Sequence, residues 1–362
     1  MAPKIAAMPP QAETESLFDD TEEDLFGEPT TSRAGVAVDA AHFDESLTRL
    51  GRLLPRSVHL GTSSWFFPGW RDLVWRGDAD YTESQLARHG LSAYAQHPLF
   101  RCVGIDRTFY QPLTVAEYAR YAGQVPLGFR FVVKAPAMIS DAAMRGKRGE
   151  PIEANPLFLD PSAALDHFVQ PAIEGLGQRA GPLLFQLSPL PGEMKRADGG
   201  IPIIEHIGGL LDALPARIGD IAPVYAIELR DPELLTPRFV RTLRQRGARL
   251  CIALHPRMPV AARQSAALRA MDALEEEGDD WRLKGPLIVR WSLAAGLRYE
   301  EARTRYAPFD RLLDPDIPTR GTLAHLIHVA IKSNQPSYVI ANNKAEGSAP
   351  LTLIELAKAV VR

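Results

Sequence analysis

Cysteine is scarce in this sequence, and long apolar runs are absent. Only two of the 362 residues are cysteines, Cys102 and Cys251, and both lie inside apolar runs. This usage is typical of reduced thiols in a protein core, so we expect a cytoplasmic protein. No apolar run approaches the ~20 residues of a membrane span. The first residues also lack the basic-then-apolar pattern of a secretory signal, so we expect no association with a membrane.

The sequence has no large net charge, and it lacks the common catalytic motifs. The formal net charge of −3 argues against a broadly basic nucleic-acid-binding surface, although a local basic cleft stays open as an alternative. The chain has no Gly-x-x-x-x-Gly-Lys-Ser/Thr loop, no His-Glu-x-x-His motif, no Gly-x-Ser-x-Gly elbow and no Cys-x-x-Cys pair. We therefore expect no cofactor, and the chemistry has to be inferred from other residues.

Residues 1–50 differ in composition from the rest of the chain. Between Glu13 and Glu28 acidic residues are frequent, and there is no lysine or arginine. Such a segment cannot bury enough apolar area to offset the entropy of ordering, so residues 1–50 are predicted to form a disordered acidic tail. Leu17-Phe18 and Leu25-Phe26 interrupt the acidic run, a pattern that can bind a protein partner. The alternative is a tail that only increases solubility.

From residue 55 onward the sequence alternates between strand and helix patterns. Period and β-propensity predict eight strands, at Val58–Ser63, Arg101–Asp106, Phe129–Lys134, Leu183–Leu187, Val224–Arg230, Arg249–His255, Leu287–Ser292 and Ser337–Asn342. Helices are predicted at Thr82–Gln96, Val115–Gly123, Ala163–Leu176, Ile203–Leu214, Pro237–Gln245, Val260–Glu277, His325–Lys332 and Leu351–Val361.

This alternation favours parallel strands joined by crossover helices. Eight such units predict an α/β fold, a closed TIM-type (β/α)8 barrel over residues 55–362. An open doubly wound sheet is the alternative, but its Gly-x-Gly-x-x-Gly turn is missing. Two long connections, Ala137–Pro161 and Ala307–Gly321, are predicted as lids over a site or as surface excursions.

Every predicted strand ends in polar or ionisable residues, and in such barrels the site lies at the carboxyl ends of the strands. The candidate residues are Ser63, Asp106, Lys134, Gln186, Glu228, Arg230, His255, Arg290, Asn342 and Asn343. Trp65, Thr108 and Tyr110 follow the first two strands and are added as candidate substrate-binding residues. The rings of Trp65 and Tyr110 could stack on sugars or bases.

Each candidate also has a purely structural interpretation. Asp106 could cap a turn, Glu228 and Arg230 could form an ion pair that closes the barrel, and His255 could be a core histidine. Their joint occurrence favours a site, because burying several charges without use is costly.

The charges at the strand ends are predominantly basic, which predicts an anionic ligand. The turn at Gly347-Ser348 precedes the last predicted helix, whose N-terminal N–H groups could bind a phosphate; the alternative is that Ser348 is a plain N-cap. Asp106, Glu228 and His255 could hold a metal ion, but Lys134 and Arg230 would oppose it electrostatically, so no metal is expected.

Several motifs resemble those of one family. Leu60–Trp65 resembles the Gly-Thr-Ser-x-Trp signature of the YecE-like family (domain of unknown function 72), and Val103–Tyr110 is similar to its second-strand motif. Phe129–Pro136, Pro182–Pro189 and Val339–Gly347 are similar to three later motifs of that family. The resemblance covers residues 57–362 and implies a TIM-type barrel, but no activity comes with it. One departure is Gly104, where the family usually has an acidic residue.

The leading hypothesis is an enzyme that acts by acid/base chemistry on a phosphorylated, sugar-like or nucleotide-like substrate. In it Glu228 is the general acid/base, Lys134 and Arg290 hold the anion, and Asp106 positions the substrate. One alternative is a metal-assisted phosphoesterase or nucleic-acid-processing barrel. Another is a non-catalytic barrel that binds a ligand and recruits a partner through residues 13–28.

Overall fold

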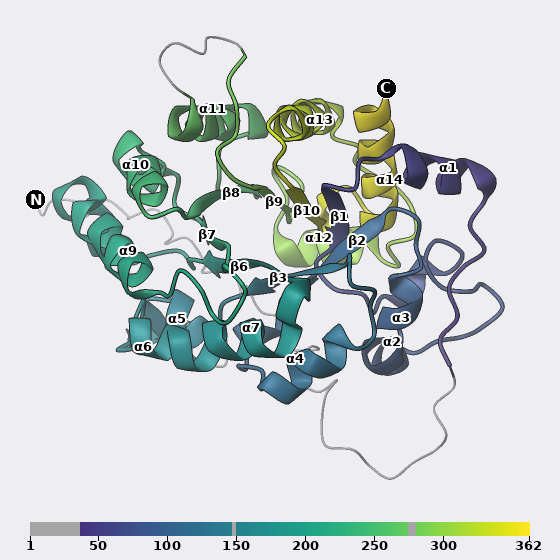
Figure 1. Ribbon diagram of the computed structural model, residues 1–362, viewed down its shortest axis with the longest axis horizontal. Helices are drawn as coiled ribbons and strands as arrows, with labels where there is room; N and C mark the ends of the chain where they lie inside the picture. Colours follow the sequence, from purple (N-terminus) through teal and green to yellow (C-terminus); the bar gives the residue numbers. More distant parts are fainter. Residues whose placement is uncertain (1–36, 147–149, 274–279) are drawn as a thin grey trace, which may run out of the picture.

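The computed structural model describes residues 37–146, 150–273 and 280–362 (Figure 1). The predicted acidic segment at residues 13–28 lies outside the described residues. No described helix is long and apolar enough to cross a membrane.

Eight parallel strands close into a barrel, as predicted (Figure 1). Around the barrel the order is β1-β10-β9-β8-β7-β6-β3-β2. The strands are β1 (Val58–Thr62), β2 (Phe100–Ile105), β3 (Arg130–Lys134), β6 (Ala180–Gln186), β7 (Tyr225–Glu228), β8 (Arg249–Leu254), β9 (Leu287–Trp291) and β10 (Ser337–Ala341). Because all eight run the same way, their carboxyl ends meet at one mouth.

Alternation along the strands separates two apolar layers. One small buried cluster fills the barrel interior and includes Cys102, Val132, Leu184, Ala226 and Cys251. The residues at the other positions of the same strands, such as Val103 and Ile227, join the larger core beneath the helices. Both cysteines are therefore buried free thiols of the barrel interior, as their apolar neighbours in the sequence predicted.

The helices surround the barrel (Figure 1). They are α1 (Glu45–Leu53), α2 (Glu83–His89), α3 (Leu91–Tyr94), α4 (Val115–Ala122), α5 (Ala137–Ser140), α6 (Pro161–Ala164), α7 (Gln170–Leu176), α8 (Gly192–Arg196), α9 (Ile201–Ala213), α10 (Pro237–Gln245), α11 (Ala261–Asp272), α12 (Tyr299–Tyr306), α13 (Ile317–Lys332) and α14 (Ala349–Val361). Capping boxes at Thr82 and Thr114 fix the starts of α2 and α4, because each threonine exchanges hydrogen bonds with the third helical residue.

Several helix boundaries differ from the prediction. The predicted helix Thr82–Gln96 is divided at Gly90 into α2 and α3. Helix α13 begins at Ile317, well before the predicted His325, because Asp316 caps it by accepting a hydrogen bond from the Thr319 N–H. The predicted long connection Ala307–Gly321 is correspondingly shorter.

The predicted insertion after the third strand has structure of its own. It holds α5 and an antiparallel pair, β4 (Ala143–Arg145) and β5 (Pro151–Ala154). The side-chain amide of Asn155 donates to the carbonyls of Met138 and Asp141, which ties the end of the pair back to α5. The insertion therefore forms a small hairpin beside the barrel mouth.

The boundary predicted at residue 50 is wrong, because the described chain is already folded before it. Helix α1 begins at Glu45, with Asp44 as its N-cap, and packs against α14. Further upstream, Ala40 pairs with Trp75, and the Ala41 N–H donates to the Val74 carbonyl at 2.9 Å. The barrel domain thus includes residues 37–50.

Candidate functional site

A small cavity of about 130 Å³ lies at the carboxyl ends of the strands. Among the predicted site residues, its walls include Ser63, Asp106, Tyr110, Lys134, Gln186, Arg230, His255, Arg290 and Asn342. These residues are far apart in the sequence, and the closed barrel brings them together. The cavity is where the sequence predicted it, at the barrel mouth.

Four predicted site residues do not line this cavity. Trp65 is buried and donates through its indole N–H to the Ala87 carbonyl at 3.3 Å. Thr108 is fully buried, and its hydroxyl donates to the carbonyls of Ile105 and Lys134. Asn343 is buried against Trp70, and Glu228 lies beneath the cavity.

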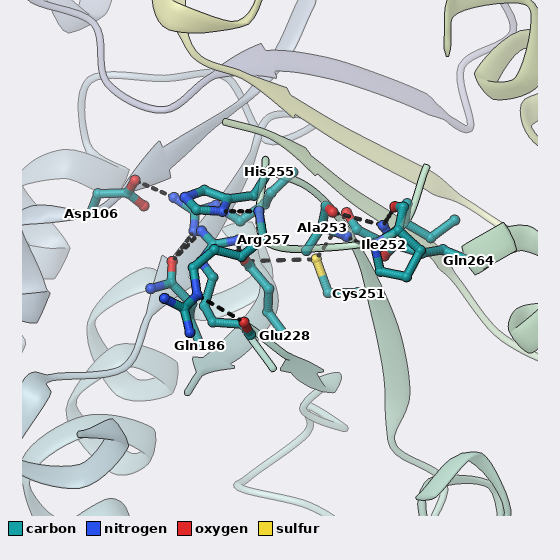
Figure 2. Close-up of polar contacts among 12 residues, drawn as sticks. Asp106, Gln186, Glu228, Cys251, Ile252, Ala253, His255, Arg257 and Gln264 are labelled. Carbon is teal, nitrogen blue, oxygen red and sulfur yellow. Dashed lines mark hydrogen bonds and ion pairs between the residues drawn. The ribbon is translucent and has the colours of Figure 1, made fainter. Parts of the chain in front are cut away.

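Two arginines form the base of the cavity and share one glutamate. The Arg230 guanidinium lies 2.6 Å from one carboxylate oxygen of Glu228, and the Arg290 guanidinium lies 3.1 Å from the other. Gln186 accepts from both guanidiniums, at 3.1 Å and 2.6 Å, and Asp106 accepts from Arg290 (Figure 2). This network fixes both guanidiniums in place before any ligand arrives.

Glu228 is the buried counter-ion of this network. Its side chain has no exposed surface, and the Cys251 thiol donates to it at 3.9 Å (Figure 2). Burial opposes ionisation, but the charges of Arg230 and Arg290 outweigh it and lower the pKa of Glu228. Glu228 is therefore a fixed anion, and burial together with its charge raises the pKa of Cys251 well above the usual range.

The surroundings of Lys134, unlike those of Glu228, favour the neutral form of the side chain. Burial lowers the pKa of Lys134 to about 8, although Asp106 pulls it upward; Arg290 and Arg230 add to the lowering. Its ammonium group lies 3.7 Å from the centre of the Phe109 ring, and its backbone carbonyl accepts from Thr108. A lysine with this pKa can both hold an anion and exchange a proton near neutral pH.

His255 adds a neutral imidazole to the wall. Burial and the nearby charges of Arg230, Arg257 and Arg290 lower the pKa of His255 to about 3. Its Nδ1 lies 3.2 Å from the Arg257 backbone N–H, which fits an acceptor nitrogen there and leaves Nε2 as the protonated one. The neutral ring can donate one hydrogen bond without adding charge.

The loop after β10 completes the cavity. The side-chain amide of Asn342 donates to the Ser63 hydroxyl at 2.9 Å, which joins the ends of β10 and β1. Lys344 lines the cavity, and its ammonium group lies 4.0 Å from the centre of the Tyr299 ring. Tyr299 was not among the predicted site residues, because it starts α12, a helix that the sequence pattern did not predict.

The start of the last helix, where a phosphate site was predicted, is buried. Ser348 is fully buried, and the Ala349 N–H at the start of α14 donates to Asn343 at 2.9 Å. Ser348 is the N-cap residue of α14, as the alternative predicted, but its side chain makes no capping hydrogen bond. Asn343 supplies the cap and also accepts from the Trp70 indole at 3.0 Å, which makes it a structural residue.

Comparison with known proteins identifies the family. The family described as "Protein of unknown function DUF72" matches residues 59–362, which is most of the chain. This chain belongs to the DUF72 family. The predicted YecE-like resemblance is thereby confirmed, and no curated protein sequence matches the chain.

Solved structures of two other DUF72 proteins share the fold. The structure of one from Thermotoga maritima has 19% identity and a TM-score of 0.57, covering 84% of this chain and 99% of that one. One from Enterococcus faecalis has 17% identity and a TM-score of 0.53, covering 84% of this chain and 95% of that one. These likenesses show the barrel, and the site of this DUF72 chain has to be interpreted from its own residues.

The structure of this DUF72 chain explains why position 104 is a glycine. A Cβ atom at Gly104 would lie 2.9 Å from the Ser63 carbonyl oxygen and 3.1 Å from the Ser63 Cα. The backbone after β1 therefore approaches β2 too closely for a side chain to fit without a shift. Gly104 helps to position Ser63, whose hydroxyl accepts from Asn342.

The described part of this DUF72 chain offers no cluster of three or more His, Cys, Asp or Glu side chains that could hold a metal ion. Asp106 and Glu228 are both ion-paired to Arg290. His255 faces the arginines as well. The electrostatics of the mouth favour an anion over a cation.

Proposed function

We propose that this protein is an enzyme that binds a small anionic substrate at the barrel mouth and acts on it by proton transfer through Lys134. The observation that carries the proposal is the position of Lys134, which lines the cavity with its pKa lowered to about 8, beside two buried guanidiniums. Perturbed pKa values of this kind are concentrated at functional sites.

The charge of the walls supports an anionic substrate. Lys134, Arg230, Arg290 and Lys344 supply four positive charges, whereas Glu83 and Asp106 supply two negative ones. A cavity of about 130 Å³ has the volume of about four water molecules, enough for one phosphate or carboxylate group. Such a group would replace water on the arginines and lysines without breaking the pair that each arginine makes with Glu228.

The proton transfer is assigned to Lys134 and not to Glu228. Glu228 is sealed below the arginines, does not line the cavity and is held ionised by two guanidiniums. A proton-transfer group has to reach its substrate and titrate near the working pH. With a pKa of about 8, about a tenth of Lys134 is neutral at pH 7, so it can act as a general base. Glu228 then keeps Arg230 and Arg290 in place.

The experiment is a screen of phosphorylated and carboxylated sugars, nucleotides and acids, followed by kinetics of two matched variants. Lys134→Met should lower kcat of the activity found by about 10²–10⁴-fold, while ligand binding persists. Lys344→Met removes a positive charge from the same wall and should raise KM with little effect on kcat. For the wild type, kcat/KM should rise with pH up to about 8. Full activity of Lys134→Met would refute the assignment.

A further inference from the structure

A second, larger depression begins where the mouth cavity ends. It has a volume of about 910 Å³, about seven times the 130 Å³ of the cavity. His255 and Leu293 line both spaces, so the two adjoin. The depression, which we call the side groove, lies between the β4–β5 hairpin on one side and the loops after β6, β8 and β9 on the other.

The side groove is mainly apolar. Ile152, Leu190, Met194, Leu293 and Leu297 line it. Four prolines also contribute, Pro151, Pro189, Pro191 and Pro256. Because proline has no backbone N–H, these segments offer few hydrogen-bond donors to a ligand. The lining also includes Glu153 and Glu193, so two carboxylates interrupt the apolar surface.

Two of the three arginines that line the side groove, Arg145 and Arg257, have acidic partners. Arg145 pairs with Asp141 at 2.5 Å. Arg257 lies 3.4 Å from Asp231 and donates to the Arg230 carbonyl at 3.3 Å. The walls of the groove are thus more apolar than those of the mouth, and the two spaces adjoin at His255 and Leu293.

Two apolar side chains of the groove are exposed to solvent. Ile152 is 67% exposed and Met194 is 36% exposed, on opposite walls formed by β5 and α8. A ligand between them would remove both from water. A substrate larger than the charged group anchored in the mouth cavity can extend into the side groove, which adjoins the cavity at His255 and Leu293.

We infer that the substrate is amphiphilic, with an anionic head in the mouth cavity and an apolar tail in the side groove. This inference rests on the proposed function for the head group and adds the chemical class of the rest of the molecule. Head and tail make separate contributions, the head by charge pairing with Lys134 and the arginines, and the tail by burial of apolar surface. The tail therefore determines specificity, and the head determines position.

The experiment compares methyl phosphate with octyl phosphate, the latter below its micelle concentration, by calorimetric titration of the full-length protein. The wild type should bind octyl phosphate at least about tenfold more tightly than methyl phosphate. The double variant Ile152→Asp/Met194→Asp should lose this difference and still bind methyl phosphate as the wild type does. Leu127→Asp, at a residue that is also 67% exposed but outside the groove, is the matched control and should keep the difference.

The outcomes separate the two proposals. Equal affinity of the wild type for both phosphates would overturn the side groove as a tail site and leave the anion site standing. A preference for octyl phosphate that survives in the double variant would overturn it as well. No binding of methyl phosphate by the wild type would overturn the anion site and, with it, the amphiphilic substrate.

Discussion

Lys134 and Glu228 show how the surroundings of two ionisable residues decide what each can do. Lys134 is the last residue of β3 and Glu228 is the last residue of β7, so both lie at the barrel mouth. Both have charged side chains nearby. Glu228 has two guanidiniums against its carboxylate and is held ionised. Burial lowers the pKa of Lys134 to about 8, and the nearby cations Arg290 and Arg230 add to this shift toward the neutral form. The residue that can exchange a proton at neutral pH is the lysine.

The strand-end pattern predicted that these residues would meet, but it could not predict how deeply each would be buried. Whether Glu228 reaches the cavity depends on Arg230 and Arg290 lying above it, and Arg290 is 62 residues away on β9. Burial at that level is a property of the closed barrel and not of local sequence. The sequence therefore predicted most of the residues that line the cavity, and their roles stay predictions.

Replacing Glu228 tests its structural role. Glu228→Gln removes the carboxylate charge that pairs with both buried guanidiniums, those of Arg230 and Arg290, so the free energy of unfolding should fall by about 3 kcal/mol. Denaturant titration at pH 7 measures this change. The matched control is Glu355→Gln, which breaks an exposed pair with Lys358 and should change stability by less than about 0.5 kcal/mol.

The pH dependence of the same variant provides a second check. Because the folded-state pKa of Glu228 is lowered from 4.5, its contribution is present above pH 4.5 and is lost as the pH falls below that value. The stability difference between wild type and Glu228→Gln should therefore shrink on acidification below pH 4.5. A difference that does not change between pH 7 and pH 3 would contradict this role.

At the scale of elements, the approach of β1 to β2 shapes one side of the mouth. Ideal Cβ atoms at Gly61 and Gly104 would lie 1.9 Å from the Cys102 carbonyl oxygen and 2.9 Å from the Ser63 carbonyl oxygen. The pairing of β1 with β2 shifts register at Gly61. Gly61 and Gly104 therefore allow β1 and β2 to approach each other closely, and the periodicity of the sequence does not predict this approach.

Gly104→Ala should destabilise the protein by about 1–3 kcal/mol, because its methyl group would displace the backbone at Ser63. Thermal unfolding measures the loss. Gly128→Ala is the control, since a Cβ there meets nothing within 4 Å and should leave stability unchanged within about 1 kcal/mol. Equal stability of the two alanine variants would show that the strands can separate without cost.

Helices that bury few residues were harder to predict from the sequence than the buried strands of the barrel. In α12 only Ala302 and Tyr306 are buried, so its sequence has little apolar periodicity to detect. Helix α13 begins with Ile317-Pro318, and the proline suggested a loop although it is well suited to a first turn. The strands of the barrel are buried on both faces, and their continuous apolar runs made them conspicuous.

At the scale of the whole molecule, parallel pairing closes the barrel of eight strands. The folded domain also includes a segment before residue 50. Asp39 pairs with Arg76 at 2.8 Å, and its backbone N–H donates to the Tyr81 hydroxyl at 3.0 Å. Composition led to the prediction of a tail over residues 1–50, since the acidic segment dominates an average over that window. The binding of a partner by residues 13–28 stays a prediction.

Two truncations test where the folded domain begins. Deleting residues 1–36 leaves the contacts of Asp39 and Ala41 with residues 74–81 in place, and Tm should stay within about 1 °C. Deleting residues 1–41 removes several hydrogen bonds to the segment 74–81 and should lower Tm by roughly 5 °C. Equal Tm values for the two truncated proteins would contradict a domain that starts before residue 41.

The central claim, that Lys134 is the proton-transfer group of an anion site, depends most directly on its pKa. Competitive acetylation between pH 6 and pH 11, followed by mass spectrometry of the peptide that contains Lys134, measures this value. The reactivity of Lys134 should titrate with a midpoint near 8. Inorganic phosphate should protect Lys134 and leave the exposed Lys332 unaffected. A midpoint near the ordinary lysine value of about 10.4, without protection by phosphate, would contradict the claim.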